Sequence, residues 1–149
     1  MKLLTTLAFA AAATIATSQA FIVTTQTGTS IGVTDNAGNP IANGAGVVVV
    51  GTFQAGAPNF ATSTGQQISD AFTQWGNAGT FGFNGFAALY QVVADGGRIT
   101  GGGANGERVG QSIWTLLGNG DSLATSTELI AYEHTTSFAD DSAGALPTS

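Results

Sequence analysis

The sequence predicts a mainly β fold, a small antiparallel β-sandwich or partly closed barrel that carries one amphipathic helix. Short segments rich in β-branched and aromatic residues alternate with turn-forming residues, and only one stretch has apolar residues at helical spacing. Asn-Gly pairs suit turns that need positive φ, so they mark the expected corners between strands. These pairs stand at 43–44, 84–85, 105–106 and 119–120.

The predicted strands follow one another between these turns. Residues 46–54, GVVVVGTFQ, form a continuous apolar run, which indicates a central strand buried on both faces. Residues 35–40, DNAGNP, form a predicted turn. The remaining predicted strands are residues 21–26, 30–34, 86–94, 112–117 and 128–134.

Residues 64–76, TGQQISDAFTQWG, predict the single helix. Thr64 and Gln67 have the spacing of a capping box, and Gly76 suits the position just after a helix. We expect the apolar face of this helix to close one end or side of the β core. Trp75 could also stack on a ligand, but its place in the helical register favours the core. The apolar face consists of Ile68, Ala71, Phe72 and Trp75, at i, i+3, i+4 and i+7.

Residues 1–20 have the pattern of a signal peptide: a basic start at Lys2, an apolar run over 3–16, and small residues before a cleavage site after Ala20. The run of about 14 residues is short for a bilayer span. We therefore expect a protein that is secreted, extracellular or at the cell surface, with no membrane span in the mature chain. Residues 21–138 form one predicted β-rich domain, and 139–149 a flexible C-terminal tail.

Composition argues against several classes of partner and site. The formal net charge is −6, and only two basic residues, Arg98 and Arg108, follow residue 20. Two cations cannot form a phosphate-binding face, so neither nucleic acid nor an anionic membrane is an expected partner. The chain has no cysteine and one histidine, His134, so any metal site would consist of oxygen ligands, which favours Ca²⁺.

Residues 120–123 spell GDSL, the motif that names a group of esterases and lipases, and His134 follows. In those hydrolases the serine block lies near the mature N-terminus, and an Asp-x-x-His block lies far downstream. Here the residue three before His134 is Ala131. Nucleophile, base and orienting acid must converge in space, which closeness in sequence does not ensure. The stretch favours a turn in which Asp121 or Ser122 caps backbone groups, rather than a serine hydrolase.

A second motif, GGGANG at 101–106, satisfies the spacing of a dinucleotide-binding loop. That loop requires a preceding strand, a helix that opens at the motif, and an acidic residue about 20 positions later. Gly110 interrupts the apolar pattern that follows, and the β-branched and aromatic residues there favour a strand. We therefore interpret this segment as a glycine-rich hairpin loop.

Calcium is the one cofactor that the sequence leaves open. Residues 35–39 and 119–121, together with Asp140 and Asp141, offer oxygen ligands, but the spacings of EF-hand and RTX loops are absent. Asp and Asn are also common turn residues, and the turn interpretation is favoured. No metal ligand, cofactor-binding residue or catalytic residue is assigned.

Aromatic residues provide the candidate ligand-binding positions. Phe81, Phe83 and Phe86 lie close together around a predicted turn, with Phe81 and Phe83 expected on one side of a strand, and Trp114 lies in a later strand. Aromatic rings of this kind can stack on sugars. Filling the core of a sandwich is the competing interpretation.

Several phrases in order resemble the small secreted bacterial proteins that carry PEP-CTERM sorting tails. These phrases are VTDNAGNPIANG, VVVVGTF, ISDAFTQWG, TFGFNGFAAL and VGQSIWTLLGNGDSLATSTELIAYE, and they span nearly all of 21–138. The sorting tail itself, with Pro-Glu-Pro, a membrane helix and a basic end, is absent from residues 139–149, which fits a freely secreted relative or a fragment. The resemblance implies export and an association with extracellular polysaccharide, and it supplies no catalytic residues.

Together these features predict a non-enzymatic structural or interaction protein of the cell surface or extracellular matrix. Its partners would be copies of itself, joined through strand edges that carry few charges, or extracellular polysaccharide. The alternative function is a glycan-binding, lectin-like module. A serine hydrolase built on Ser122 is a third and weaker hypothesis.

Overall fold

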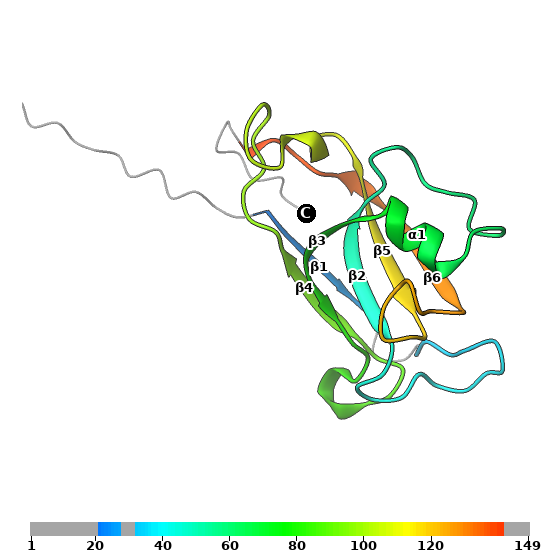
Figure 1. The fold of residues 1–149 in the computed structure, drawn as a ribbon. Helices are drawn as coiled ribbons and strands as arrows, with labels where there is room; N and C mark the ends of the chain where they lie inside the picture. The colour runs from blue at the N-terminus through cyan, green and yellow to red at the C-terminus, as the bar shows by residue number, and fades with distance from the viewer. Residues whose placement is uncertain (1–20, 28–31, 142–149) are drawn as a thin grey trace, which may run out of the picture.

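A computed structural model describes residues 21–27 and 32–141, and confirms a mainly β fold in two antiparallel sheets. The described residues form one α-helix, six strands and two short 3₁₀ helices (Figure 1). These elements are β1 (Ile22–Gln26), β2 (Val47–Thr52), α1 (Gly65–Ala71), β3 (Thr73–Gly79), η1 (Phe83–Gly85), β4 (Gln91–Asp95), η2 (Gly106–Arg108), β5 (Ser112–Gly118) and β6 (Leu129–Ser137).

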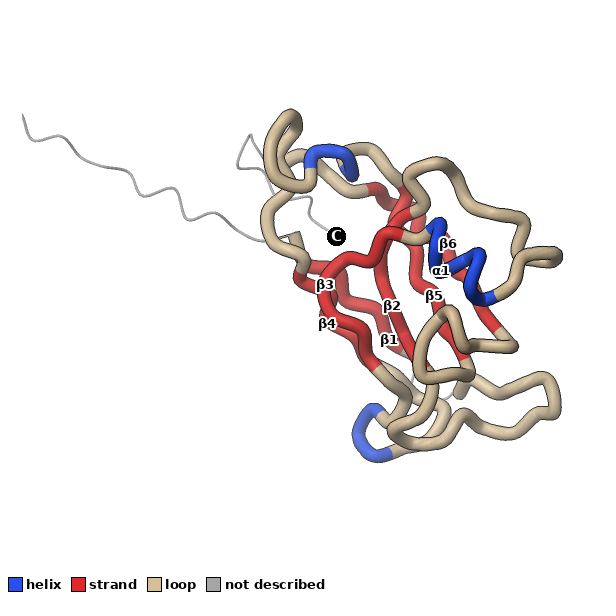
Figure 2. Tube along the Cα trace, in the orientation of Figure 1, coloured by secondary structure: helices blue, strands red, loops and turns tan. Residues whose placement is uncertain are grey.

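The larger sheet has the strand order β3-β2-β5-β6, and the smaller sheet pairs β1 with β4. The smaller sheet lies against one face of the larger sheet, and α1 lies against the other (Figure 1). Loops make most of the connections between strands (Figure 2). Among the described strands, β1 is hydrogen-bonded to β4 alone and β6 to β5 alone, so the strands do not close into a barrel.

The core between the two sheets follows from alternation along each strand. β1 and β4 bury every second residue, and the inward set includes Val23, Val92 and Ala94. The facing residues of the larger sheet are Val48 and Val50 of β2, Trp75 of β3, and Ile113 and Leu117 of β5.

A second apolar cluster lies on the helix side of the larger sheet. Val47 and Val49 of β2 point to this side, where they pack with Ile68 of α1 and Leu116 of β5. All six residues of β2 are therefore buried, which confirms the prediction of a central strand that is covered on both faces. The helix covers one face of the core, as its apolar pattern predicted.

The predicted helix over 64–76 is too long. Its start is confirmed, because Thr64 and Gln67 form both hydrogen bonds of the capping box, but α1 ends at Ala71. Phe72 is the C-cap in extended conformation, and β3 begins at Thr73 because this segment pairs with β2. As a result, Trp75 lies in a strand and not on the helix. Its predicted place in the core is confirmed, since it is 1% exposed.

Gly76 lies within β3 and does not terminate the helix. Between Trp75 and Gly79, β3 has two more residues than the facing part of β2, which defines a bulge. Gly76 adopts a φ of +67°, and a Cβ atom there would lie 2.5 Å from the backbone nitrogen of Asp95. A glycine at this position permits both the bulge and the close approach of β3 to β4.

Two predicted strands differ from the structure. Residues 32–34 form no strand, although Thr34 makes one isolated bridge with Pro40, and residues 30–31 lie outside the described part. The strand predicted over 86–94 begins only at Gln91. The backbone of Ala88 instead binds the preceding loop: its oxygen accepts from the nitrogen of Val33, and its nitrogen donates to the oxygen of Ile41.

Packing at the C-terminal end continues past Phe138, the predicted end of the domain. The nitrogen of Asp141 donates to the oxygen of Ile99, and its carboxylate accepts from the nitrogen of Ile99. The ordered contacts therefore extend to at least Asp141. The predicted signal peptide over 1–20 and the rest of the predicted tail, 142–149, lie outside the described residues. Within the described ranges, no helix has the length and apolar character needed to cross a bilayer.

Candidate functional site

The GDSL stretch forms a hydrogen-bonded loop between β5 and β6. The Ser122 hydroxyl lies 2.9 Å from the Thr125 hydroxyl and accepts a hydrogen bond from the Thr125 nitrogen at 3.2 Å. The carboxamide oxygen of Asn119 accepts from the nitrogens of Thr127 and Glu128. Polar side chains here cap backbone groups, which confirms the turn interpretation.

The structure does not bring His134 to Ser122. The imidazole Nε2 of His134 lies 2.8 Å from the hydroxyl of Thr115 on β5. Leu129 pairs with Gly118 beside the loop, and His134 lies five residues farther along β6, which corresponds to about 17 Å of strand. Burial lowers the pKa of His134 from its ordinary value. His134 is half-buried and hydrogen-bonded to β5.

In the glycine-rich segment, residues 101–105 form turns and Gly106 begins η2. The segment is a loop but not a hairpin, because it joins β4 of the smaller sheet to β5 of the larger sheet. The helix that a dinucleotide-binding loop requires is replaced by three residues of 3₁₀ helix. This segment positions Arg108, which forms an ion pair with Glu107 and stacks over the ring of Trp75 at 5.3 Å from its centroid. The burial of Arg108 could not be predicted from the sequence, because no local pattern distinguishes a buried arginine from an exposed one.

The side chain of Asp35 stabilises the DNAGN turn at residues 35–39. One carboxylate oxygen of Asp35 accepts from the backbone nitrogens of Ala37 and Asn39, and the other accepts from the side-chain amide of Asn39. The Asn39 nitrogen is the main cause that lowers the pKa of Asp35. The turn interpretation is confirmed for this segment. Within the described residues, no three His, Asp or Glu side chains are grouped so that they could hold a metal ion.

The four aromatic residues predicted to bind a ligand do not form one surface. Phe81 is buried between the sheets and contacts the ring of Tyr90, with centroids 5.8 Å apart. Phe83 is half-buried in η1, and Phe86 is exposed. Trp114 faces the helix side of the larger sheet, where it contacts Phe53 and Phe60. Phe81 and Phe83 therefore share no strand, because this segment turns into η1.

The two sheets have four edge strands, β1 and β4 in the smaller sheet and β3 and β6 in the larger. The edges of β3 and β4 approach each other at Gly76 and Asp95, which leaves β1 and β6 as the candidate edges for pairing with another chain. Each is hydrogen-bonded on one side to a described strand, and the backbone on the other side lacks a strand partner within the described residues. β1 contains no charged residue, and β6 contains one acidic residue, Glu133, with His134 beside it. Neither strand contains the lysine or proline that commonly protects a sheet edge from pairing.

Exposed apolar side chains gather beside these edges. Ile22 of β1 and Val93 of β4 lie on the outer face of the smaller sheet, and Ile130 and Tyr132 lie on β6. Their exposed fractions run from 48% for Ile130 to 57% for Val93. They are four of the six large apolar side chains that are exposed in the described part of the chain. The candidate interaction surface therefore comprises β1, β6 and these four side chains.

Comparison of the chain with protein-family models, with curated proteins and with solved structures gives no match. The resemblance to PEP-CTERM-sorted proteins stays a prediction from the sequence. No site residue is transferred from another protein, and the functional inference rests on the geometry described above.

Proposed function

We propose that this chain is an exported, non-enzymatic structural protein of the cell surface or extracellular matrix that assembles with copies of itself through its edge strands. One observation supports this function above the others: exposed apolar residues concentrate beside two edge strands that carry almost no charge. Ile22 and Val93 lie beside one edge, and Ile130 and Tyr132 beside the other, so each edge has a pair of exposed apolar side chains that contact with a second copy could cover.

The favoured arrangement pairs β6 of one copy with β1 of the next. If β6 paired with β6 of a second copy in antiparallel register around its centre, the two Glu133 side chains would lie close together, and like charges on neighbouring strands are unfavourable. β1 is uncharged, so pairing of β6 with β1 avoids this repulsion. Such an interface uses different surfaces on the two copies, and it therefore produces either rings or open filaments.

Sedimentation velocity of the full chain over a range of concentrations tests this function, with and without Ca²⁺. We expect the mean mass to rise with concentration. Thr24→Lys on β1 and Thr136→Lys on β6 each place a cation on an exposed edge position and should reduce assembly. Gln66→Lys on α1 makes the same change in charge away from both edges and serves as the control.

Assembly that both edge variants reduce and the Gln66→Lys variant retains would support the proposal. A monomer at every concentration would contradict it. Equal loss of assembly in all three variants would also contradict it, because net charge and not the edge would then control association. A dimer that stops growing would contradict the β6-to-β1 arrangement in favour of an interface between identical surfaces.

The positions of Ser122 and His134 support a non-enzymatic function. Ser122 and His134 bind Thr125 and Thr115 respectively, so the hydrolase hypothesis lacks a nucleophile held by its base. We expect no turnover of p-nitrophenyl acetate above the rate of the Ser122→Ala variant. Turnover that this substitution removes would overturn the assignment.

A further inference from the structure

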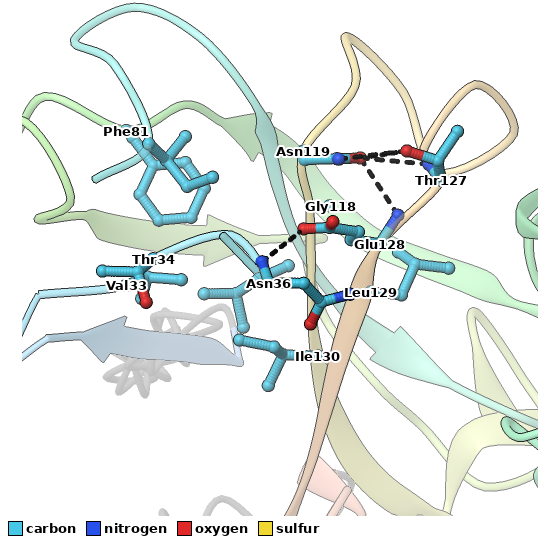
Figure 3. A pocket seen from close by; sticks show the side chains of 12 residues that line it. Val33, Thr34, Asn36, Phe81, Gly118, Asn119, Thr127, Glu128, Leu129 and Ile130 are labelled. Carbon is cyan, nitrogen blue, oxygen red and sulfur yellow. Dashed lines mark hydrogen bonds between the residues drawn. The ribbon is translucent and has the colours of Figure 1, made fainter. Parts of the chain in front are cut away.

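A cavity of about 290 Å³ opens at the end of the larger sheet where β5 passes into β6 (Figure 3). Its wall comes from the loop over 33–41, from Phe81, and from the β5–β6 hairpin. The floor includes the buried or half-buried apolar residues Ile41, Phe81 and Leu117. Its volume is near the lower end of the range for ligand pockets, roughly 300 to 1,000 Å³, so it suits one small ring.

The rim of this cavity is polar and is held by residues far apart in the sequence. One carboxylate oxygen of Glu128, Oε2, accepts from the backbone nitrogen of Asn36 at 3.1 Å, which ties the loop to the hairpin. Asn119 holds the backbone of Glu128 in place, because its carboxamide oxygen accepts a hydrogen bond from the Glu128 nitrogen at 3.1 Å. Figure 3 shows these contacts at the mouth of the pocket.

Three polar groups of the rim have no hydrogen-bond partner among the described residues. The second carboxylate oxygen of Glu128, the side-chain amide of Asn36 and the hydroxyl of Thr34 all belong to lining residues, and none forms a hydrogen bond with the described residues. A carboxylate accepts hydrogen bonds, whereas an amide and a hydroxyl both donate and accept. The side chain of Asn119 bonds Thr127 and Glu128 through both its oxygen and its nitrogen, and it therefore positions the rim.

We propose that this pocket binds one unit of a neutral saccharide. Neighbouring sugar hydroxyls match a rim that contains both donors and acceptors, and hydrogen bonds to the carboxylate are charge-assisted. The C–H face of the ring would lie on the apolar floor. Among the described residues that line the cavity, Glu128 is the only charged one, so an acidic sugar is disfavoured by repulsion between like charges. A sugar hydroxyl can accept from Asn36 or Thr34 as well as donate to Glu128, whereas an ammonium group can only donate.

The pocket adjoins the assembly surface, because Leu129 and Ile130 of β6 belong to its lining. The two edge substitutions, at Thr24 and Thr136, lie outside the lining, so loss of assembly in those variants is distinguishable from loss of sugar binding. The same chemistry could come from a free sugar or from a unit of a polysaccharide. Titration of the full chain, followed by ligand-observed NMR, would use the methyl glycosides of glucose, galactose, mannose and N-acetylglucosamine, with glucuronate as the acidic counterpart. Dextran, galactan and mannan provide the polysaccharide arm.

We expect saturable binding of at least one neutral probe, and weaker binding of glucuronate. Glu128→Gln retains an oxygen for Asn36 and removes the charge, which should weaken binding about tenfold. Val33→Phe should fill the cavity and abolish binding. Glu133→Gln removes a carboxylate from β6, five residues after Glu128 and outside the lining, and should leave affinity unchanged. Thermal melting of each variant checks that it folds.

Binding of a free glycoside would identify a soluble sugar as the ligand, and binding of a polysaccharide alone would identify a glycan chain. Either result supports the site if the affinity falls in every pocket variant that folds, Glu128→Gln or Val33→Phe, and stays the same in the Glu133→Gln variant. The proposal is overturned if no neutral probe binds, if glucuronate binds more tightly than glucose, or if neither pocket variant changes the affinity.

Discussion

Trp75 links three parts of the chain. Its indole N–H donates to the backbone oxygen of Phe21 at 3.0 Å, at the start of β1. Its ring packs against Phe138 at a centroid distance of 5.3 Å, and Arg108 stacks over it. Sequence reasoning predicted its burial but not its partners, because they lie 33 or more residues away along the chain and no local pattern identifies them.

We predict that Trp75→Ala lowers the free energy of unfolding by about 3 to 5 kcal/mol, through lost burial and the cavity that remains. Trp75→Phe should lower the free energy of unfolding by less, roughly 1 to 3 kcal/mol, because it retains a ring but leaves the oxygen of Phe21 without its donor. Urea unfolding measures both. Trp114→Phe is the control, since Trp114 is only half-buried, and an equal cost at both positions would contradict the role of Trp75.

His134 predicts a pH dependence of stability. Burial lowers its pKa in the folded protein below the ordinary value of 6.5, so folding favours the neutral ring. The contribution of the neutral His134 ring to the free energy of unfolding is fully present above pH 6.5, and it is lost as the pH falls through the pKa of the folded protein. The contribution of Asp35, whose pKa is lowered from 3.8, is lost only at more acidic pH.

The urea midpoint should therefore be lower at pH 5 than at pH 7.5, and His134→Gln should reduce this difference. His134 is the only histidine of the chain, which makes the comparison direct. If the variant retains the full difference between pH 5 and pH 7.5, another group must be responsible for the pH dependence.

Among the elements, α1 shows which signals in a sequence are local. The capping box depends on residues three positions apart, and both of its hydrogen bonds are present. The end of the helix depends on β2, which pairs with the residues from Thr73 onward. Helical spacing of Phe72 and Trp75 suggested a longer helix, whereas in the structure these two rings contact different clusters, on opposite faces of the larger sheet.

Thr64→Ala should lower the free energy of unfolding by about 1 kcal/mol, because it leaves the nitrogen of Gln67 without its side-chain acceptor. Ser63→Ala is a matched control in the adjacent position, where the side chain caps no helix nitrogen. Chemical denaturation of both variants is sufficient. Equal destabilisation by the two substitutions would show that the cap contributes nothing specific.

The strands predicted over 30–34 and 86–94 failed for a related reason. Their residues have strand-like composition, but the backbones of Val33 and Ala88 bind each other across a loop and do not extend a ladder. β-propensity describes residues that suit a pleated, half-buried surface, and it does not specify which surface is available. Continuous apolar character, as in β2, was the more reliable signal because it requires cover on both faces.

At the scale of the whole molecule, composition and spacing were sufficient to predict a mainly β, antiparallel fold with one helix, but left open whether it was a sandwich or a partly closed barrel. The structure has two separate sheets. The pocket between the loop over 33–41 and the β5–β6 hairpin could not be predicted, because Asn36 and Glu128 are 92 positions apart and meet only after the sheets pack. Three of the four aromatic positions selected from the sequence lie away from this pocket, and only Phe81 contributes to its wall.

Export is a prediction at the same scale. If residues 1–20 direct secretion and are removed, the protein recovered outside the cell should begin at Phe21. N-terminal sequencing and intact mass of the extracellular protein test this directly. Recovery of an intact N-terminus inside the cell would contradict the proposed location.

Hydrogen–deuterium exchange as a function of protein concentration is the most direct test of assembly through β1 and β6. The backbone N–H groups of these strands that face away from their sheets should exchange rapidly in dilute protein and become protected as concentration rises. The amides of β2 and β5, which are already paired on both sides, should not change. Equal exchange of β1 and β6 at low and high concentration would contradict the account.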